Sequence, residues 1–152
     1  SGKVTVAQNT SAKPTNYPIS DVKIIIDGLV VGTTDNNGNF TISLETGSYE
    51  AELRYTYGIS RNIYFIVEDE DIYITEPISM IACDFNKDNQ IDSNDMTLFR
   101  MVISSSADDV SYLRFVDMNN DGYINGRDQA YITSCMGIIG SEYEYQTLIF
   151  RK

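Results

Sequence analysis

The stretch Asp84-Phe-Asn-Lys-Asp-Asn-Gln-Ile-Asp-Ser-Asn-Asp95 and the stretch Asp117-Met-Asn-Asn-Asp-Gly-Tyr-Ile-Asn-Gly-Arg-Asp128 repeat one twelve-residue pattern. The two copies begin 33 residues apart. Each has Asp or Asn at positions 1, 3, 5, 9 and 12 and an isoleucine at position 8, and a helical run follows. Because the same spacing of oxygen-bearing side chains occurs twice, it indicates a pair of metal-binding loops rather than two unrelated polar turns.

Calcium takes six to eight oxygen ligands, and a loop of the EF-hand type supplies them from positions 1, 3, 5, 7, 9 and 12. Position 7 contributes its backbone carbonyl, and position 9 often acts through a water molecule. The pattern therefore predicts two Ca²⁺ ions. The expected ligands are Asp84, Asn86, Asp88, Gln90, Asp92 and Asp95 in the first loop, and Asp117, Asn119, Asp121, Tyr123, Asn125 and Asp128 in the second.

Two departures from the usual loop stand out. Position 12 is Asp in both copies instead of Glu, so each exiting helix must begin closer to the ion. Position 6 is Gly122 in the second copy but Asn89 in the first, and Asn tolerates the left-handed backbone region better than most residues. We expect Ile91 and Ile124 to pair between the loops.

Residues 77–83 show no amphipathic pattern, so the first loop lacks an entering helix, which argues against a calmodulin-like sensor.

An order of loop, helix, linker, loop and helix, with Asp at position 12, resembles a dockerin, the module that attaches cellulosomal subunits to cohesins. The resemblance covers about residues 83–146. The preceding stretches 34–42, 47–49 and 77–80 resemble the X module beside type II dockerins in scaffoldins, and the tail 140–146 looks type II-like. The resemblance implies an extracellular, calcium-dependent module that docks tightly to a cohesin of a scaffoldin or of a cell-surface anchoring protein.

The sequence predicts two domains. Residues 1–81 contain short alternating apolar runs without a helical pattern, which indicates an all-β sandwich of the immunoglobulin or prealbumin type. Residues 82–152 are expected to form a small all-α dockerin with two calcium-loop–helix (F-hand) repeats. The expected strands are 3–7, 21–27, 29–34, 39–44, 48–57, 61–67, 72–75 and 78–82, with 8–18 as a loop. The expected helices are 93–104, capped by Ser93 or Asn94, then a short one over 108–115, and 126–137.

In dockerins the outer faces of the exiting helices carry cohesin recognition. The resemblance implies that loop positions 10, 11, 17 and 18 do so here, which are Ser93, Asn94, Arg100, Met101, Gly126, Arg127, Thr133 and Ser134. Leu98, Met101 and Tyr131 are further anchors, because exposed apolar side chains on a helix often lie at interfaces. The two copies differ at every one of these positions, so we expect docking in a single orientation.

Composition excludes several functions. The net charge is −11, divided as −6 in residues 1–82 and −5 in residues 83–152. Seven acidic residues of the second part lie in the loops, so two Ca²⁺ would leave it at about −1. No basic patch is present, which argues against nucleic acid as a partner. There is no histidine, so a His-based triad or zinc site is excluded, and we expect no enzymatic activity.

No apolar run approaches 18 residues and no signal peptide is present, so we expect no direct membrane insertion and a piece of a larger secreted protein.

Three alternatives remain open from the sequence. Cys83 and Cys135 either form a disulfide that clasps the module or remain two small buried thiols. Tyr55, Tyr57 and Tyr64 either stack on sugar rings, as in a calcium-stabilised carbohydrate-binding surface domain, or pack on the sheet. The parent protein is either a scaffoldin or a carbohydrate-active enzyme that ends in the same pair of modules.

Overall fold

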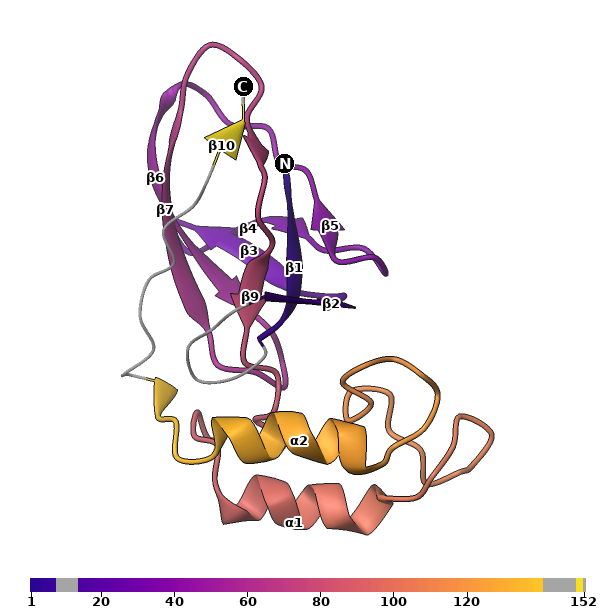
Figure 1. The fold of residues 1–152 in the computed structure, drawn as a ribbon. Coiled ribbons are helices and arrows are strands. Elements are labelled where there is room, and N and C mark those ends of the chain that lie inside the picture. The colour runs from indigo at the N-terminus through magenta and orange to yellow at the C-terminus, as the bar shows by residue number, and fades with distance from the viewer. Residues whose placement is uncertain (8–13, 141–149, 152) are drawn as a thin grey trace.

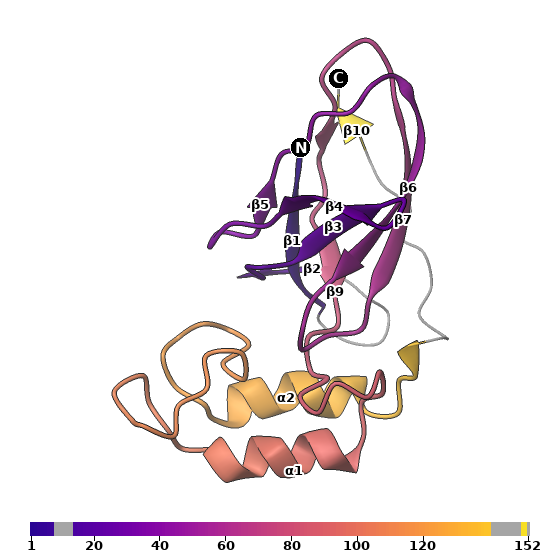
Figure 2. The same ribbon diagram turned by 180° about the vertical axis from the view of Figure 1, so that it is seen from behind.

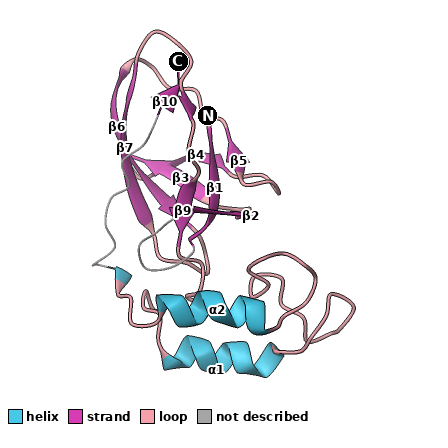
Figure 3. Cartoon of the chain, viewed as in Figure 1, coloured by secondary structure: helices cyan, strands magenta, loops and turns pink. Residues whose placement is uncertain are grey.

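A computed structural model describes residues 1–7, 14–140 and 150–151 of the 152-residue chain (Figure 1). The described part divides into a β-rich end and a helical end, as the colouring by secondary structure makes plain (Figure 3). Within these described residues, the order of elements is nine strands, two helices and a final strand. Among the described residues, no helix is long and apolar enough to span a membrane.

The first sheet is organised around β1 (Gly2–Ala7). This strand pairs antiparallel with β2 (Pro14–Pro18) and with β5 (Asn39–Phe40), and parallel with β9 (Ile78–Met80). We expected residues 14–18 to be a loop because of their two prolines, and this expectation is wrong. Both prolines lie at the ends of an edge strand, where a missing backbone donor is tolerated.

The second sheet has the order β4 (Leu29–Thr33), β3 (Lys23–Ile26), β6 (Gly47–Arg54) and β7 (Arg61–Val67), with every pair antiparallel. Alternation along β6 and β7 buries Ala51, Leu53, Ile63 and Phe65. These side chains join the buried residues of β1, β3 and β9 in one apolar cluster. The two sheets lie around this cluster (Figures 1 and 2), so this end of the chain is all-β, as the sequence predicts; it is called the sandwich from here on.

Several strands are shorter than expected. β5 ends at Phe40 instead of residue 44, β6 ends at Arg54 instead of residue 57, and β9 ends at Met80 instead of residue 82. In β6 the reason is a turn at residues 55–58, where the backbone N–H of Gly58 donates to the carbonyl of Tyr55 at 3.3 Å. β8 (Tyr73–Ile74) pairs antiparallel with β10 (Phe150–Arg151), which the sequence did not predict.

The helical end holds α1 (Ser93–Val102) and α2 (Gly126–Cys135). Both are two residues shorter than expected. The chain after α1 turns at Ser104, with φ of 74°, and the chain after α2 turns at Gly137, with φ of 88°. The expected helix over 108–115 is absent, and the segment forms turns. There the Asp109 carboxylate accepts from the backbone N–H of Ser106, three residues before it, instead of capping a helix that starts after it.

Each loop pairs with the segment that follows the other helix. The backbone N–H of Ile91 donates to the carbonyl of Ile138 at 2.9 Å, and that of Gly137 donates to Ile91 at 2.7 Å. In the other half, the N–H of Ile124 donates to Ser105 at 2.9 Å, and that of Ser104 donates to Ile124 at 2.8 Å. Both isoleucines are fully buried, but their backbone partners are the post-helix segments rather than each other. The two repeats are thereby tied together.

The two ends of the molecule share one core. The ring of Tyr57, just after β6, stacks on Phe115 with centroids 3.7 Å apart and an interplanar angle of 5°. Phe115 also contacts Phe85, at position 2 of the first loop, with centroids 6.0 Å apart. The backbone N–H of Asp84 donates to the carbonyl of Tyr57 at 3.0 Å. The apolar cluster runs without a break from the sandwich into the helices, so the two modules are expected to stabilise each other.

Candidate calcium loops and docking face

The first loop is wound by hydrogen bonds from its backbone to its own acidic side chains. The carboxylate of Asp84 accepts from the backbone N–H of Asp88 at 3.1 Å and of Asn89 at 2.9 Å. The side chain of Asn86 accepts from Asp88 at 3.2 Å, and Asp88 accepts from the N–H of Gln90 at 3.0 Å. These are Asx turns, in which the predicted ligands at positions 1, 3 and 5 hold the loop in shape.

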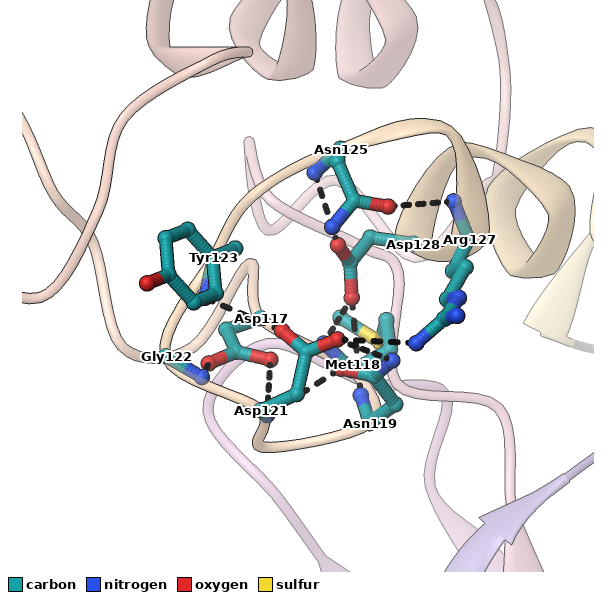
Figure 4. A network of polar contacts seen from close by, with 9 residues as sticks. All are labelled: Asp117, Met118, Asn119, Asp121, Gly122, Tyr123, Asn125, Arg127 and Asp128. Carbon is teal, nitrogen blue, oxygen red and sulfur yellow. Dashed lines mark hydrogen bonds and ion pairs between the residues drawn. The ribbon is translucent and has the colours of Figure 1, made fainter.

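The second loop repeats these bonds almost atom for atom (Figure 4). Asp117 accepts from the N–H of Asp121 at 3.1 Å and of Gly122 at 2.9 Å. Asn119 accepts from Asp121 at 3.2 Å, and Asp121 accepts from Tyr123 at 3.0 Å. The repeat in the sequence is therefore a repeat in geometry, which two unrelated polar turns would not give.

The last positions of each loop also cap the exiting helix. Asp92 is the N-cap of α1 and accepts from the N–H of Asn94 at 2.7 Å, while Asp95 accepts from the N–H of Asp92 at 2.9 Å. Asn125 and Asp128 form the same capping box on α2, at 2.8 and 2.9 Å. The expected caps of α1 were Ser93 or Asn94, and the N-cap is instead Asp92, which lies one residue earlier.

Position 12 also reaches back across its own loop. Asp95 accepts from the backbone N–H of Phe85 at 2.7 Å, and Asp128 accepts from that of Met118 at 2.9 Å. Each helix begins within its loop, so the short Asp side chain at position 12 still reaches the backbone N–H at position 2. At position 6, Asn89 has φ of 67° and Gly122 has φ of 85°, so the replacement of Gly by Asn keeps the left-handed backbone.

The electrostatics of the loops favour a cation. Four carboxylates are buried, with relative exposures from 0 to 4%: Asp84, Asp95, Asp117 and Asp128. The ion pairs found among the described residues, Arg54–Glu52 and Arg127–Asp121, do not include any of these four carboxylates. Burial raises the pKa of Asp84 and of Asp128. The Asp95 carboxylate adds to the rise at Asp84, and the Asp117 carboxylate adds to the rise at Asp128. Buried acids without a basic partner fit a bound divalent cation.

Within the described residues, no group of three or more acidic, histidine or cysteine side chains converges closely enough to hold a metal ion. In each loop, oxygens of the predicted ligands at positions 1, 3, 5, 9 and 12 accept hydrogen bonds from backbone N–H groups. The predicted set also relies on Asn86, Asn119 and the carbonyls of Gln90 and Tyr123, which are oxygen donors of the kind that Ca²⁺ accepts. Both Gln90 and Tyr123 have exposed side chains, as expected where only the carbonyl is used.

A side chain from outside the loops hydrogen-bonds to the carboxylate of a predicted ligand. The hydroxyl of Tyr112 donates to the carboxylate of Asp117 at 2.6 Å, and burial together with this bond raises the pKa of Tyr112 to about 12. Nearby, Arg114 donates to the backbone carbonyl of Asp117 at 3.2 Å. Position 79, which corresponds to Tyr112 in the first copy, is a serine. Sequence analysis missed this contact because the loop pattern begins only at Asp117.

The predicted recognition residues separate into two groups. Asn94, Leu98 and Met101 follow one stripe of α1, and Leu98 and Met101 are 38% and 73% exposed. Arg100 is exposed on the same helix. On α2, the exposed predicted positions are Gly126, Arg127, Thr133 and Ser134.

Tyr131 lies elsewhere. Its ring meets that of Tyr17, on β2 of the sandwich, edge to face with centroids 5.8 Å apart, and burial raises its pKa to about 12. Both views show α2 between α1 and the sandwich (Figures 1 and 2). The outer face of α1 is therefore the more open of the two.

The other candidate residues have structural surroundings. Tyr55 and Tyr57 pack edge to face with centroids 6.0 Å apart, and Tyr57 is also covered by Phe115, so neither ring is free to stack on a sugar. Tyr64 is 58% exposed on β7. Cys83 and Cys135 are free thiols, each 1% exposed. The interaction between the two thiols, together with burial, raises the pKa of Cys83, and the same interaction lowers the pKa of Cys135.

Comparisons with known proteins agree with this geometry. Residues 82–134 match the family model of the dockerin type I domain. Two solved structures from Acetivibrio cellulolyticus share the fold, and both are interface mutants of a type II cohesin–X-dockerin complex. The C-terminal interface mutant has a TM-score of 0.69 and 22% identity, and the N-terminal interface mutant 0.67 and 21%. Each match covers 93% of this chain and 97% of the other chain. No curated protein matches the chain.

The class of protein follows from the duplicated loops and their helices together with the family match. The chain carries a dockerin module over residues 82–134. With its β-sandwich, it has the overall fold of an X module–dockerin pair.

Proposed function

We propose that this chain docks to a cohesin in a calcium-dependent manner during the assembly of an extracellular cellulosome. The observation that carries the proposal is the duplicated loop, whose ligands at positions 9 and 12 are also the caps of the exiting helices. A Ca²⁺ ion in each loop would supply the positive charge that the buried carboxylates lack. Each ion would thereby fix where a helix starts and which way its outer face points.

The docking face consists of the outer surfaces of the two helices, with its apolar anchors on α1. Met101 and Leu98 are the exposed apolar side chains of that stripe, and an exposed flexible Met adapts well to a partner surface. Asn94 and Arg100 supply polar contacts beside them, and the exposed positions of α2 complete the face. The partner is a cohesin of the type II class, which occurs in the complexes that share this fold.

Docking occurs in a single orientation. A rotation by half a turn would exchange Leu98 with Tyr131 and Met101 with Ser134, since these residues are 33 positions apart. Tyr131 is held against Tyr17 of the sandwich, and Ser134 is small and polar. The second helix therefore has no equivalent of the apolar anchors on α1.

The X module has two roles in this proposal. It stiffens the dockerin through the Tyr57–Phe115 stack, and it covers part of α2. The parent protein would be a scaffoldin that reaches the cell surface through its cohesin partner. We expect no catalytic activity from either module.

Calorimetric titration against a panel of type I and type II cohesins, in calcium and in EDTA, tests the proposal. We expect one-to-one binding to a type II cohesin in calcium and none in EDTA. The variants Met101→Asp and Ser134→Asp then test the orientation, because only the first should weaken binding strongly. Calcium uptake without a response to any cohesin, or equal losses in both variants, would contradict the docking face.

A further inference from the structure

One aromatic side chain of the sandwich lies against the first predicted calcium loop and against the segment that enters the second. The ring of Tyr57 stacks on Phe115, with centroids 3.7 Å apart and an interplanar angle of 5°. Phe115 is two residues before Asp117, the first predicted ligand of the second loop. The ammonium of Lys87, at position 4 of the first loop, lies over the same ring, with its Nζ atom 4.8 Å from the centroid. A single ring therefore contacts a residue of each repeat.

The sandwich holds Tyr57 in place. The backbone N–H of Ile59 donates to the carbonyl of Ile81 at 2.9 Å. A Cβ atom added to Gly58 would lie 2.6 Å from the same carbonyl oxygen, so the turn that carries Tyr57 packs directly on the chain that leads to the first loop. At the start of that loop, the backbone N–H of Asp84 donates to the carbonyl of Tyr57 at 3.0 Å. Both contacts of the ring thus start from a fixed point.

We infer that Tyr57 is a positioning residue for calcium, through which the two loops bind their ions cooperatively. A loop that closes around its ion orders Lys87 or Phe115, and this fixes the ring against which the other repeat packs. The other loop then loses less conformational freedom on binding, so its affinity rises, and by thermodynamic linkage the effect is equal in both directions. The inference rests on calcium loading of the loops, which is part of the proposed function, and it requires no cohesin.

The two loops depend on Tyr57 in different ways. Lys87 lies between the predicted ligands at positions 3 and 5 of its loop, so an ammonium that swings toward the ion would repel it. The face of an aromatic ring attracts a cation, and Tyr57 thereby holds this charge against the sandwich instead. The second loop has the neutral Asn120 at position 4, and its link to the ring is the stack with Phe115.

Calorimetric titration of calcium into the whole chain measures the coupling. The backbone amides of Asn89 and Gly122, at position 6 of each loop, report in NMR spectra which loop is loaded. We expect the wild type to bind two ions cooperatively. Tyr57→Leu removes the ring, and it should weaken calcium binding by about 10-fold and make the loops bind independently. Tyr57→Phe should retain the cooperativity, because both contacts are made by the ring.

A control separates positioning from stability, because a less stable sandwich would by itself weaken calcium binding. Ile63 lies on β7 and is 1% exposed in the core of the sandwich. Ile63→Val removes a buried methyl group and should lower the melting temperature in EDTA. It leaves the ring of Tyr57 in place, so we expect the two loops of this variant to remain cooperative.

Cooperative binding in Tyr57→Leu, or its loss in Ile63→Val, would overturn the inference, since the coupling would then bypass the ring or follow stability alone. Two ions that bind independently to the wild type would overturn it as well and would leave the proposed function intact. If the chain binds no calcium, the calcium dependence of the proposed function fails too. Cooperative calcium binding without a response to any cohesin supports this inference and contradicts only the docking.

Discussion

Asp128→Asn separates the two roles of a position-12 carboxylate. In the structure Asp128 accepts from the backbone N–H groups of Met118 at 2.9 Å and of Asn125 at 2.9 Å. An Asn side chain keeps one oxygen acceptor but places an amide N–H₂ against the other donor. Without calcium, one capping bond is lost, at a cost of about 1–2 kcal/mol. Removal of a buried charge that has no basic partner offsets part of this cost.

With calcium present the same change removes a charged ligand. If the second loop is loaded at about 1,000 times its Kd, binding contributes roughly 4 kcal/mol to stability, and most of this is lost with the ligand. The free energy of unfolding should therefore fall by about 1 kcal/mol in EDTA and by about 3–5 kcal/mol in calcium. Urea denaturation in the two buffers, followed by circular dichroism, measures both values.

Asp92→Asn is the matched control, because the second loop already has Asn125 at the same position and that residue caps α2 in the same way. We expect this control to change stability by less than about 1 kcal/mol in either buffer. Equal losses for Asp128→Asn in EDTA and in calcium would refute the reasoning, because the carboxylate would then be only a helix cap.

Three further predictions test the docking face, the Tyr112 contact and the junction. Met101→Asp should weaken cohesin binding by about 100-fold without a change in melting temperature, whereas Leu29→Asp, at 69% exposure on the sandwich, should leave binding unchanged. Tyr112→Phe should raise the calcium Kd of the second loop by about 10-fold in calorimetry, because Asp117 loses the hydroxyl that orients it; an unchanged Kd would mean that the backbone alone positions the ligand. Phe115→Ala should destabilise the chain by about 3 kcal/mol. In calorimetric scans the sandwich and the dockerin should then unfold in separate transitions, and a single unaltered transition would contradict a shared core.

The two loops repeat the same hydrogen bonds because the information for them is local in the sequence. Side-chain oxygens at fixed spacing determine both the Asx turns and the capping boxes, and the second copy repeats the first. The N-cap of α1 was placed one residue late because Asp92 had been considered only as a ligand, whereas one carboxylate does both. The helix expected over 108–115 failed since Asp109 bonds backward to Ser106, an alternative that local propensity does not resolve.

Contacts between distant segments could not be predicted in the same way. Tyr57 and Phe115 are 58 positions apart, and nothing in either local pattern pairs them. Helical periodicity placed Tyr131 on an outer face but could not indicate that β2 would cover it. The strand β2 was not predicted because a proline at each end is typical of a loop. Proline is tolerated here because β2 lies at the edge of its sheet, and the local sequence does not indicate that position.

The asymmetry of the dockerin follows from these distant contacts as much as from its sequence. The two loops have almost the same hydrogen bonds, so calcium alone would orient both helices equally. The sandwich breaks this equivalence, because Tyr17 engages α2 and no described residue of the sandwich forms such a ring contact with α1. A module that packs on one repeat and leaves the other open determines which helix can present its anchors. If docking occurs as proposed, the sandwich would therefore act on specificity, through the choice of helix, as well as on stability.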